Sequence, residues 1–169
     1  MVGERPLGRP SGLSIFDKSP SRNQTLNIGV AHLEKFALLE DVIPFVESHY
    51  SAQPDREHRA LAGLSMGGGQ SLNFGLRHLE AFAWVGGFSS APNTKAATEL
   101  VPAPAETAKQ LKLLWISCGD KDGLFGISQG FHRYLKDKDV PHIWHVDSGG
   151  HTREVWRNDL YLLAQQLFR

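Results

Sequence analysis

A serine lies between two glycines in residues 63–67 (Gly-Leu-Ser-Met-Gly), directly after a short apolar run. A serine hydroxyl is a poor nucleophile near neutral pH, so it needs a base that removes its proton and an acid that orients the base. Glycines two positions before and after the serine would let a strand turn sharply into a helix and expose the hydroxyl. We therefore predict that Ser65 is a nucleophile. The alternative is a glycine-rich turn that only permits tight packing of a strand and a helix.

Candidates for the acid and the base follow in the order serine, aspartate, histidine. The acid is expected in residues 118–123 (Cys-Gly-Asp-Lys-Asp-Gly), where Asp120 and Asp122 compete almost evenly on pattern alone. Either aspartate could instead be a plain turn residue. The base is expected to be His151, because the two glycines before it let the backbone turn sharply enough to bring an imidazole over the rim of a sheet. The other histidines fall on or beside expected helices and strands, without such a glycine pair.

Short strands and helices that alternate along the chain must position these side chains. Strands are expected over residues 59–64, 81–88, 111–118 and 142–146, with a further short strand over 25–30. Helices are expected over residues 32–50, 71–78, 126–137 and 152–168, with Pro44 kinking or restarting the first and with a loop around Pro102 and Pro104. This order predicts an α/β fold, a mostly parallel sheet with helices on both faces.

Ligands bind at the carboxyl ends of the strands in such sheets. Ser65, Asp122 and His151 each follow the end of an expected strand, so all three should lie on one rim. The amide of Met66, at a helix start, would point toward an oxyanion formed beside Ser65.

Three residues near this rim are candidates for substrate binding. Leu124 and Phe125 follow the acid and could line an acyl pocket, although a core role is equally expected. Ser90, in the loop over residues 89–94, could form another wall.

The composition describes an ordinary globular domain: 41% of the 169 residues are hydrophobic and the formal net charge is zero. Neither nucleic acid nor a membrane surface is an expected partner. No apolar run approaches the ~20 residues that span a bilayer. Residues 1–10 contain no apolar core of a signal peptide, so a cytoplasmic location is expected for the chain as written. Cys118 is the only cysteine, which excludes an intramolecular disulfide.

Several motifs together resemble one family. They are residues 60–69 around the serine, 82–84 (Phe-Ala-Trp) with 88–89, 118–122, and 149–151 with 155–156. Over residues 33–169 the chain resembles the esterase D-like group of α/β hydrolases, most closely the feruloyl esterases of carbohydrate esterase family 1. The resemblance implies a serine esterase acting on feruloyl or acetyl esters of plant polysaccharide, without a metal or organic cofactor. It also places the catalytic aspartate on Asp122.

The chain departs from this family in its first half. The family domain has about eight strands and a His-Gly loop that supplies a second oxyanion amide, whereas this chain has no His-Gly pair and about four or five expected strands. Residues 1–169 are thus expected to form a single, partial domain with an irregular segment over residues 1–31. Thioester hydrolysis, acyl transfer, or a weakly active remnant that serves as a binding or assembly module are the alternatives.

The strand that ends at Ser65 would lie in the middle of the family's sheet, and here it is expected to be an edge. Either residues 25–30 cover this edge, or two chains form a homodimer through it. A strictly monomeric protein with an uncovered edge strand would contradict both expectations.

Overall fold

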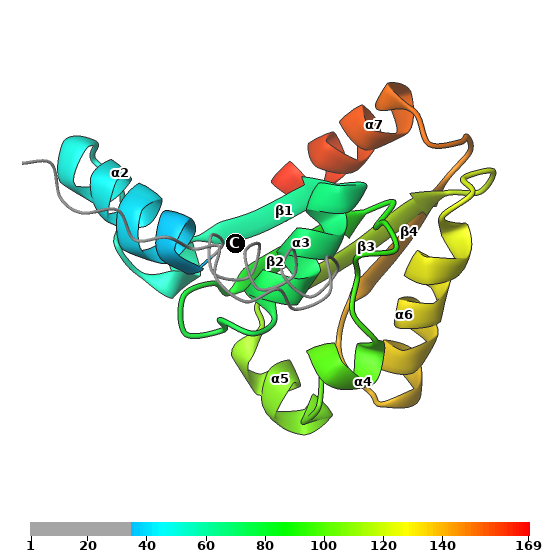
Figure 1. Ribbon diagram of the computed structural model, residues 1–169, viewed down its shortest axis with the longest axis horizontal. Helices are drawn as coiled ribbons and strands as arrows, with labels where there is room; N and C mark the ends of the chain where they lie inside the picture. Colours follow the sequence, from blue (N-terminus) through cyan, green and yellow to red (C-terminus); the bar gives the residue numbers. More distant parts are fainter. Residues whose placement is uncertain (1–34) are drawn as a thin grey trace, which may run out of the picture. The chain divides into compact units, whose positions relative to one another are not determined.

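A parallel sheet of four strands organises residues 51–169 in the computed structural model (Figure 1). The strands are β1 (Ala60–Leu64), β2 (Trp84–Phe88), β3 (Leu113–Gly119) and β4 (Ile143–Asp147). They lie in sequence order, and every neighbouring pair is parallel. The predicted fold class is therefore confirmed.

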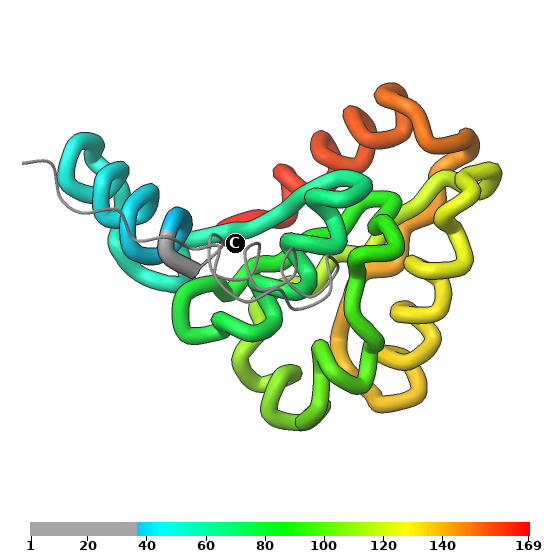
Figure 2. The backbone as a smooth tube through the Cα atoms, viewed as in Figure 1, coloured from blue at the N-terminus to red at the C-terminus, as the bar shows by residue number. Residues whose placement is uncertain are grey.

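Helices connect the strands, and the last one returns along the sheet after β4 (Figure 2). They are α3 (Met66–Gly75), α4 (Ala97–Leu100), α5 (Pro104–Gln110), α6 (Phe125–Asp137) and α7 (Arg153–Ala164). Among these, α3 and α7 cover opposite faces of β2. A Cβ at Gly86 would meet Leu163 of α7, and one at Gly87 would meet Leu72 of α3. Because successive residues of a strand point to opposite faces, the two helices form the outer layers of a three-layer structure.

The hydrophobic core on the α7 face centres on Phe88, Trp115 and Leu163, each less than 5% exposed. β2 is buried along its whole length and β3 almost so, as expected for parallel strands covered on both faces. Burial of this kind stabilises a domain by about 1.5–3 kcal/mol for each large apolar side chain. The middle of the sheet is thus a rigid base for the loops at its carboxyl edge.

The structure describes residues 35–169, which fall into two units divided between Tyr50 and Ser51. In the first unit a π-helical segment, Lys35–Val42, leads into helix α2 (Ile43–His49). Pro44 lies in the first turn of α2, where its missing amide costs no hydrogen bond, so the predicted restart is confirmed. The strand expected over residues 25–30 and the whole irregular segment expected over residues 1–31 lie outside the described residues. Within the described part of the chain, no helix is long and apolar enough to span a membrane.

Several boundaries differ from the predictions, and three of these differences have the clearest bearing on the helices. Helix α3 begins at Met66 rather than at residue 71, and three consecutive glycines directly after Met66, whose helix propensity is poor, masked its start. The prediction of a loop around Pro102 and Pro104 was partly wrong, because Pro104 is the first residue of α5. Helix α7 ends at Ala164, four residues before the expected end.

β1 is an edge of the sheet that residues 51–169 form, since it pairs only with β2 there. Leu64 at its end is 44% exposed. Cover by residues 25–30, or pairing with a second chain, stays a prediction.

Candidate active site

Ser65 lies at the sharp turn between β1 and α3, with φ 55° and ψ −120°. A residue with a side chain rarely adopts a positive φ, and such strain persists only where the surroundings impose it. Here the amide of Ser65 donates to the carbonyl of Phe88 (2.9 Å), and its carbonyl accepts from the amides of Ala91 (3.0 Å) and Gly69 (3.2 Å). Three backbone hydrogen bonds thus hold Ser65 at the carboxyl edge of the sheet.

The two glycines of the serine motif have different roles. A Cβ at Gly63 would overlap the carbonyl oxygen of Gly67 and lie 2.5 Å from its carbonyl carbon and 2.8 Å from Ser71 Oγ. A Cβ at Gly67 would meet nothing within 4 Å among the described residues. The expectation that both positions need a small residue is therefore met at Gly63 alone, where α3 crosses closely over β1.

Substituting Gly63 with alanine is expected to lower the free energy of unfolding by about 2–4 kcal/mol, because the backbone of α3 must move away from β1. The matched control is Gly67→Ala, which should be neutral or stabilising by up to about 1 kcal/mol because alanine favours a helix. Urea unfolding followed by circular dichroism measures both changes. Equal destabilisation by the two substitutions would contradict the packing difference.

His151 connects Ser65 to Asp122. With its Nδ1 protonated, the imidazole donates to Asp122 Oδ2 (2.8 Å), and its Nε2 accepts from the Ser65 hydroxyl (2.9 Å). Its side chain is 34% exposed, whereas that of Asp122 is fully buried. A carboxylate on Nδ1 fixes the tautomer in which Nε2 is free to take a proton. The structure thus brings together the three residues that the sequence singled out, from three different loops.

The buried carboxyl of Asp122 is held in its ionised form. Burial alone would raise its pKa, but hydrogen bonds from the Leu124 amide (2.8 Å), His151 and Ser89 outweigh burial and keep the pKa below its ordinary value. An ionised Asp122 can stabilise an imidazolium when His151 accepts a proton.

Asp120, the competing acid, has a different place. Its Oδ1 accepts from the amide of Gly149 (2.8 Å), and its own amide donates to the carbonyl of Asp147 (2.8 Å). It therefore fixes the loop that carries His151 and does not contact the imidazole hydrogen-bonded to Asp122. A Cβ at Gly119, one residue earlier, would meet the carbonyl groups of this same loop, so the two loops pack backbone against backbone.

The remaining predicted residues are spread over several environments. Met66 begins α3, so its amide has no partner within the helix, and its side chain is 63% exposed. Leu124 is half-buried and its amide is engaged by Asp122. Phe125 packs against Trp144 of β4, with ring centroids 5.8 Å apart, which favours the core role. Ser90 is only 1% exposed and its Oγ would lie 2.9 Å from a Cβ at Gly68, so it packs under α3 instead of lining a surface.

Two neighbours of the catalytic residues were not predicted in the roles that the structure gives them. Ser89 is buried, has φ 45°, and supports the ionised form of Asp122. It directly follows β2, so the rule that found the other rim residues could have found it. The rings of Trp156 in α7 and His151 lie in a T-shaped arrangement, with centroids 4.7 Å apart. Cys118 lies behind Ser89, and burial raises the pKa of its thiol to about 11, so it is no rival nucleophile.

The parallel sheet, the strained serine at the end of β1 and the hydrogen-bonded Ser65, His151 and Asp122 at one rim define an α/β-hydrolase architecture. The chain belongs to the family described as "Putative esterase", which matches residues 16–166. An endo-1,4-β-xylanase/feruloyl esterase of Xylanibacter ruminicola is 30% identical over 146 residues, which are 85% of this chain and 19% of that protein.

Solved structures give the same result for the fold. A ferulic acid esterase that is 27% identical has a TM-score of 0.69 over 79% of this chain and 60% of its own. The CE1 ferulic acid esterase of Anaeromyces mucronatus, 24% identical, has a TM-score of 0.71 over 89% of this chain and 59% of its own. The chain thus spans about 60% of these structures and a smaller part of the xylanase/esterase.

Proposed function

We propose that this chain is a carboxylic-ester hydrolase that works through an acyl-enzyme on Ser65. The observation that carries the proposal is the continuous hydrogen-bonded path from the Ser65 hydroxyl through His151 to the buried, ionised Asp122. The path supplies the base and the orienting acid that a serine hydroxyl needs.

In the proposed reaction, Ser65 Oγ attacks the ester carbonyl while its proton moves to His151 Nε2. The tetrahedral intermediate carries an oxyanion, which the Met66 amide would stabilise. His151 then protonates the departing alcohol, and the ester C–O bond breaks to leave an acyl-enzyme. Water, deprotonated by His151, releases the acid and restores Ser65.

The proposed substrates are feruloyl or acetyl esters of plant polysaccharide. Support comes from the two relatives at 27% and 30% identity, which are described as a ferulic acid esterase and as a xylanase/feruloyl esterase. Acceptor choice depends on the pocket and not on the serine, histidine and aspartate, so transfer to a sugar or thioester cleavage uses the same residues.

An ester panel tests this proposal. Methyl ferulate, acetylated xylan and 4-nitrophenyl acetate are each incubated with the protein, and an acid quench traps the acyl-enzyme for mass spectrometry. We expect an acyl group on the peptide that contains Ser65, and faster turnover of methyl ferulate than of the nitrophenyl ester. An unmodified Ser65 together with no hydrolysis of any ester would favour the binding-module alternative. Acylation followed by transfer to added xylose in place of hydrolysis would identify an acyltransferase.

A further inference from the structure

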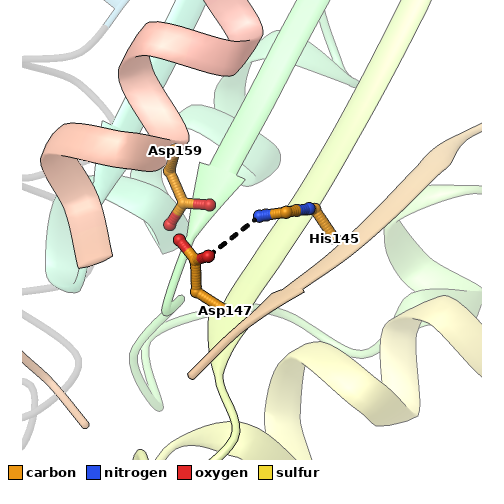
Figure 3. A group of neighbouring side chains, drawn as sticks. All are labelled: His145, Asp147 and Asp159. Atoms are coloured by element: carbon orange, nitrogen blue, oxygen red, sulfur yellow. Dashed lines mark ion pairs between the residues drawn. The ribbon is translucent and has the colours of Figure 1, made fainter. Parts of the chain in front are cut away.

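Between the sheet and α7 lies a second group of titratable side chains, which we call the α7 cluster: His145 and Asp147 of β4, and Asp159 of α7 (Figure 3). One ligand atom from each residue can be chosen so that all three lie within 4.8 Å of one another. His145 Nε2 and Asp147 Oδ1 are 3.3 Å apart. The three side chains point toward a common centre (Figure 3).

The register of the sheet explains this convergence. His145 and Asp147 are two residues apart in β4, so their side chains share a face of the sheet. Ser117 of the neighbouring strand β3 pairs with His145. That face is the one covered by α7, since Ser117 is two residues from the core tryptophan Trp115. Asp159 enters the same layer from the helix. The cluster therefore belongs to the architecture and does not depend on a loop conformation.

Asp159 is fully buried, and neither of its carboxylate oxygens has a hydrogen-bond partner in residues 35–169. His145 Nε2 is also buried without a hydrogen-bond partner. The same is true of the Ser117 hydroxyl, which faces Asp159 but lies outside hydrogen-bond geometry. Burial raises the pKa of Asp159 to about 6, which outweighs the lowering by the Ser117 hydroxyl; the charge of Asp147 adds a smaller increase and His145 a smaller decrease. No lysine or arginine in the described part of the chain pairs with either aspartate. Such a buried group is costly unless a cation or a proton compensates it.

We propose that the α7 cluster binds one divalent transition-metal ion, best Zn²⁺. One imidazole nitrogen and two carboxylate oxygens suit Zn²⁺, whereas Mg²⁺ and Ca²⁺ prefer sites made of oxygen alone. Adjacent ligands of a tetrahedral Zn²⁺ with bonds near 2.1 Å lie about 3.4 Å apart, which the His145–Asp147 pair already matches. Asp159 would move inward, because a separation of up to 4.8 Å would have to shorten to about 3.4 Å, and the Ser117 hydroxyl or a water molecule could take the fourth position.

The surroundings already orient one ligand. Asn158 donates from Nδ2 to Asp147 Oδ2 (2.8 Å), which leaves Oδ1 directed toward His145. Outer hydrogen bonds of this kind are typical of metal sites in proteins. The bound ion would tie α7 to the carboxyl end of β4. The carbonyl of Asp147 accepts from the amide of Asp120, whose side chain in turn accepts from the amide of Gly149. The bound ion would therefore also stabilise the loop that carries His151. The ion would therefore stabilise the fold without touching an ester substrate, whatever the activity of Ser65.

Metal binding and thermal unfolding of the tag-free, chelator-treated protein test the site. Equilibrium dialysis should find one Zn²⁺ for each chain, and a free concentration about 100 times the Kd should raise the Tm by about 5–10 °C. Both effects should disappear in Asp159→Asn and in His145→Gln. The control is His142→Gln, because His132 Nδ1 and His142 Nε2 lie 2.8 Å apart and form an imidazole pair elsewhere in the fold that could also take zinc.

Cobalt supplies an independent reading. Co²⁺ in the wild type should give the strong visible absorption of a four-coordinate site, and Asp159→Asn should abolish it. Equal zinc binding by wild type and Asp159→Asn would overturn the proposal, as would binding that vanishes only in His142→Gln. The proposal would also be overturned if zinc did not stabilise the wild type and Asp159→Asn raised the Tm without metal. In that case a proton, and not a metal ion, would compensate the buried carboxylate of Asp159. If Asp159→Asn fails to fold, His145→Gln decides.

Discussion

Substituting Ser65 with alanine is expected to lower kcat for ester hydrolysis by about 10⁴- to 10⁶-fold, because no acyl-enzyme can form without its hydroxyl. Methyl ferulate hydrolysis at saturating substrate measures the change. KM should change much less than kcat, since the hydroxyl acts mainly after the substrate has bound. Folding should be retained, because the hydrogen bonds that impose the turn come from the backbone of Ser65.

His151→Ala provides the matching test of the proposed path. If Ser65 and His151 act as one unit, the double variant should be no slower than either single variant. Ser48→Ala serves as a control for the loss of a serine, since its hydroxyl bonds locally in α2, to the carbonyl of Phe45 and to His49. Equal rates for wild type and Ser65→Ala would disprove a nucleophilic Ser65, and an additive double variant would show that His151 does not serve it.

The absolute rate of the wild type depends on the oxyanion donors. The described residues supply one identified amide, that of Met66, and loss of a donor costs about 100- to 1000-fold in kcat. The ratio of variant to wild type is therefore the informative quantity, because both carry the same set of donors. A low wild-type rate with a large ratio still supports the proposed mechanism.

The rim of the sheet could be predicted from sequence because two simple patterns agree. Apolar runs of the length of a buried strand each end at a polar residue, and parallel strands bring those ends together. The start of α3 was missed because Gly67, Gly68 and Gly69 are poor helix formers. In the folded protein, however, four of the six residues that follow Gly67 are buried. Tertiary packing outweighs intrinsic propensity there.

The choice between Asp120 and Asp122 could not be predicted from the residues alone, because both lie in one turn. The turn directs Asp122 toward His151 and Asp120 toward the amide of Gly149, a difference that only the three-dimensional path of the two loops decides. The α7 cluster was missed because His145 lies within a strand and was not considered as a site residue for that reason. Its alternation with Asp147 was visible, but the contribution of Asp159 requires knowing that α7 covers that face.

Converting Asp122 to asparagine is expected to reduce kcat by up to about 10⁴-fold while the fold is retained. Asparagine has nearly the same shape, but its neutral amide neither selects the tautomer with Nδ1 protonated nor stabilises the imidazolium of His151. The matched variant is Asp120→Asn, whose side-chain oxygen can still accept from the amide of Gly149 and should lower kcat less than about tenfold. Steady-state hydrolysis of methyl ferulate, with circular dichroism to monitor folding, separates the two.

The pH dependence of the unfolding free energy gives the Asp122→Asn variant a second readout. Because the pKa of Asp122 lies below its ordinary value of 3.8, its charge stabilises the folded wild type above about pH 4, and that stabilisation is lost as the pH falls through the lowered pKa. Asp122→Asn lacks this contribution, so its deficit in unfolding free energy should shrink below pH 4. An Asp120→Asn variant that loses more activity than Asp122→Asn would reverse the assignment, and would mean that the loops rearrange when substrate binds.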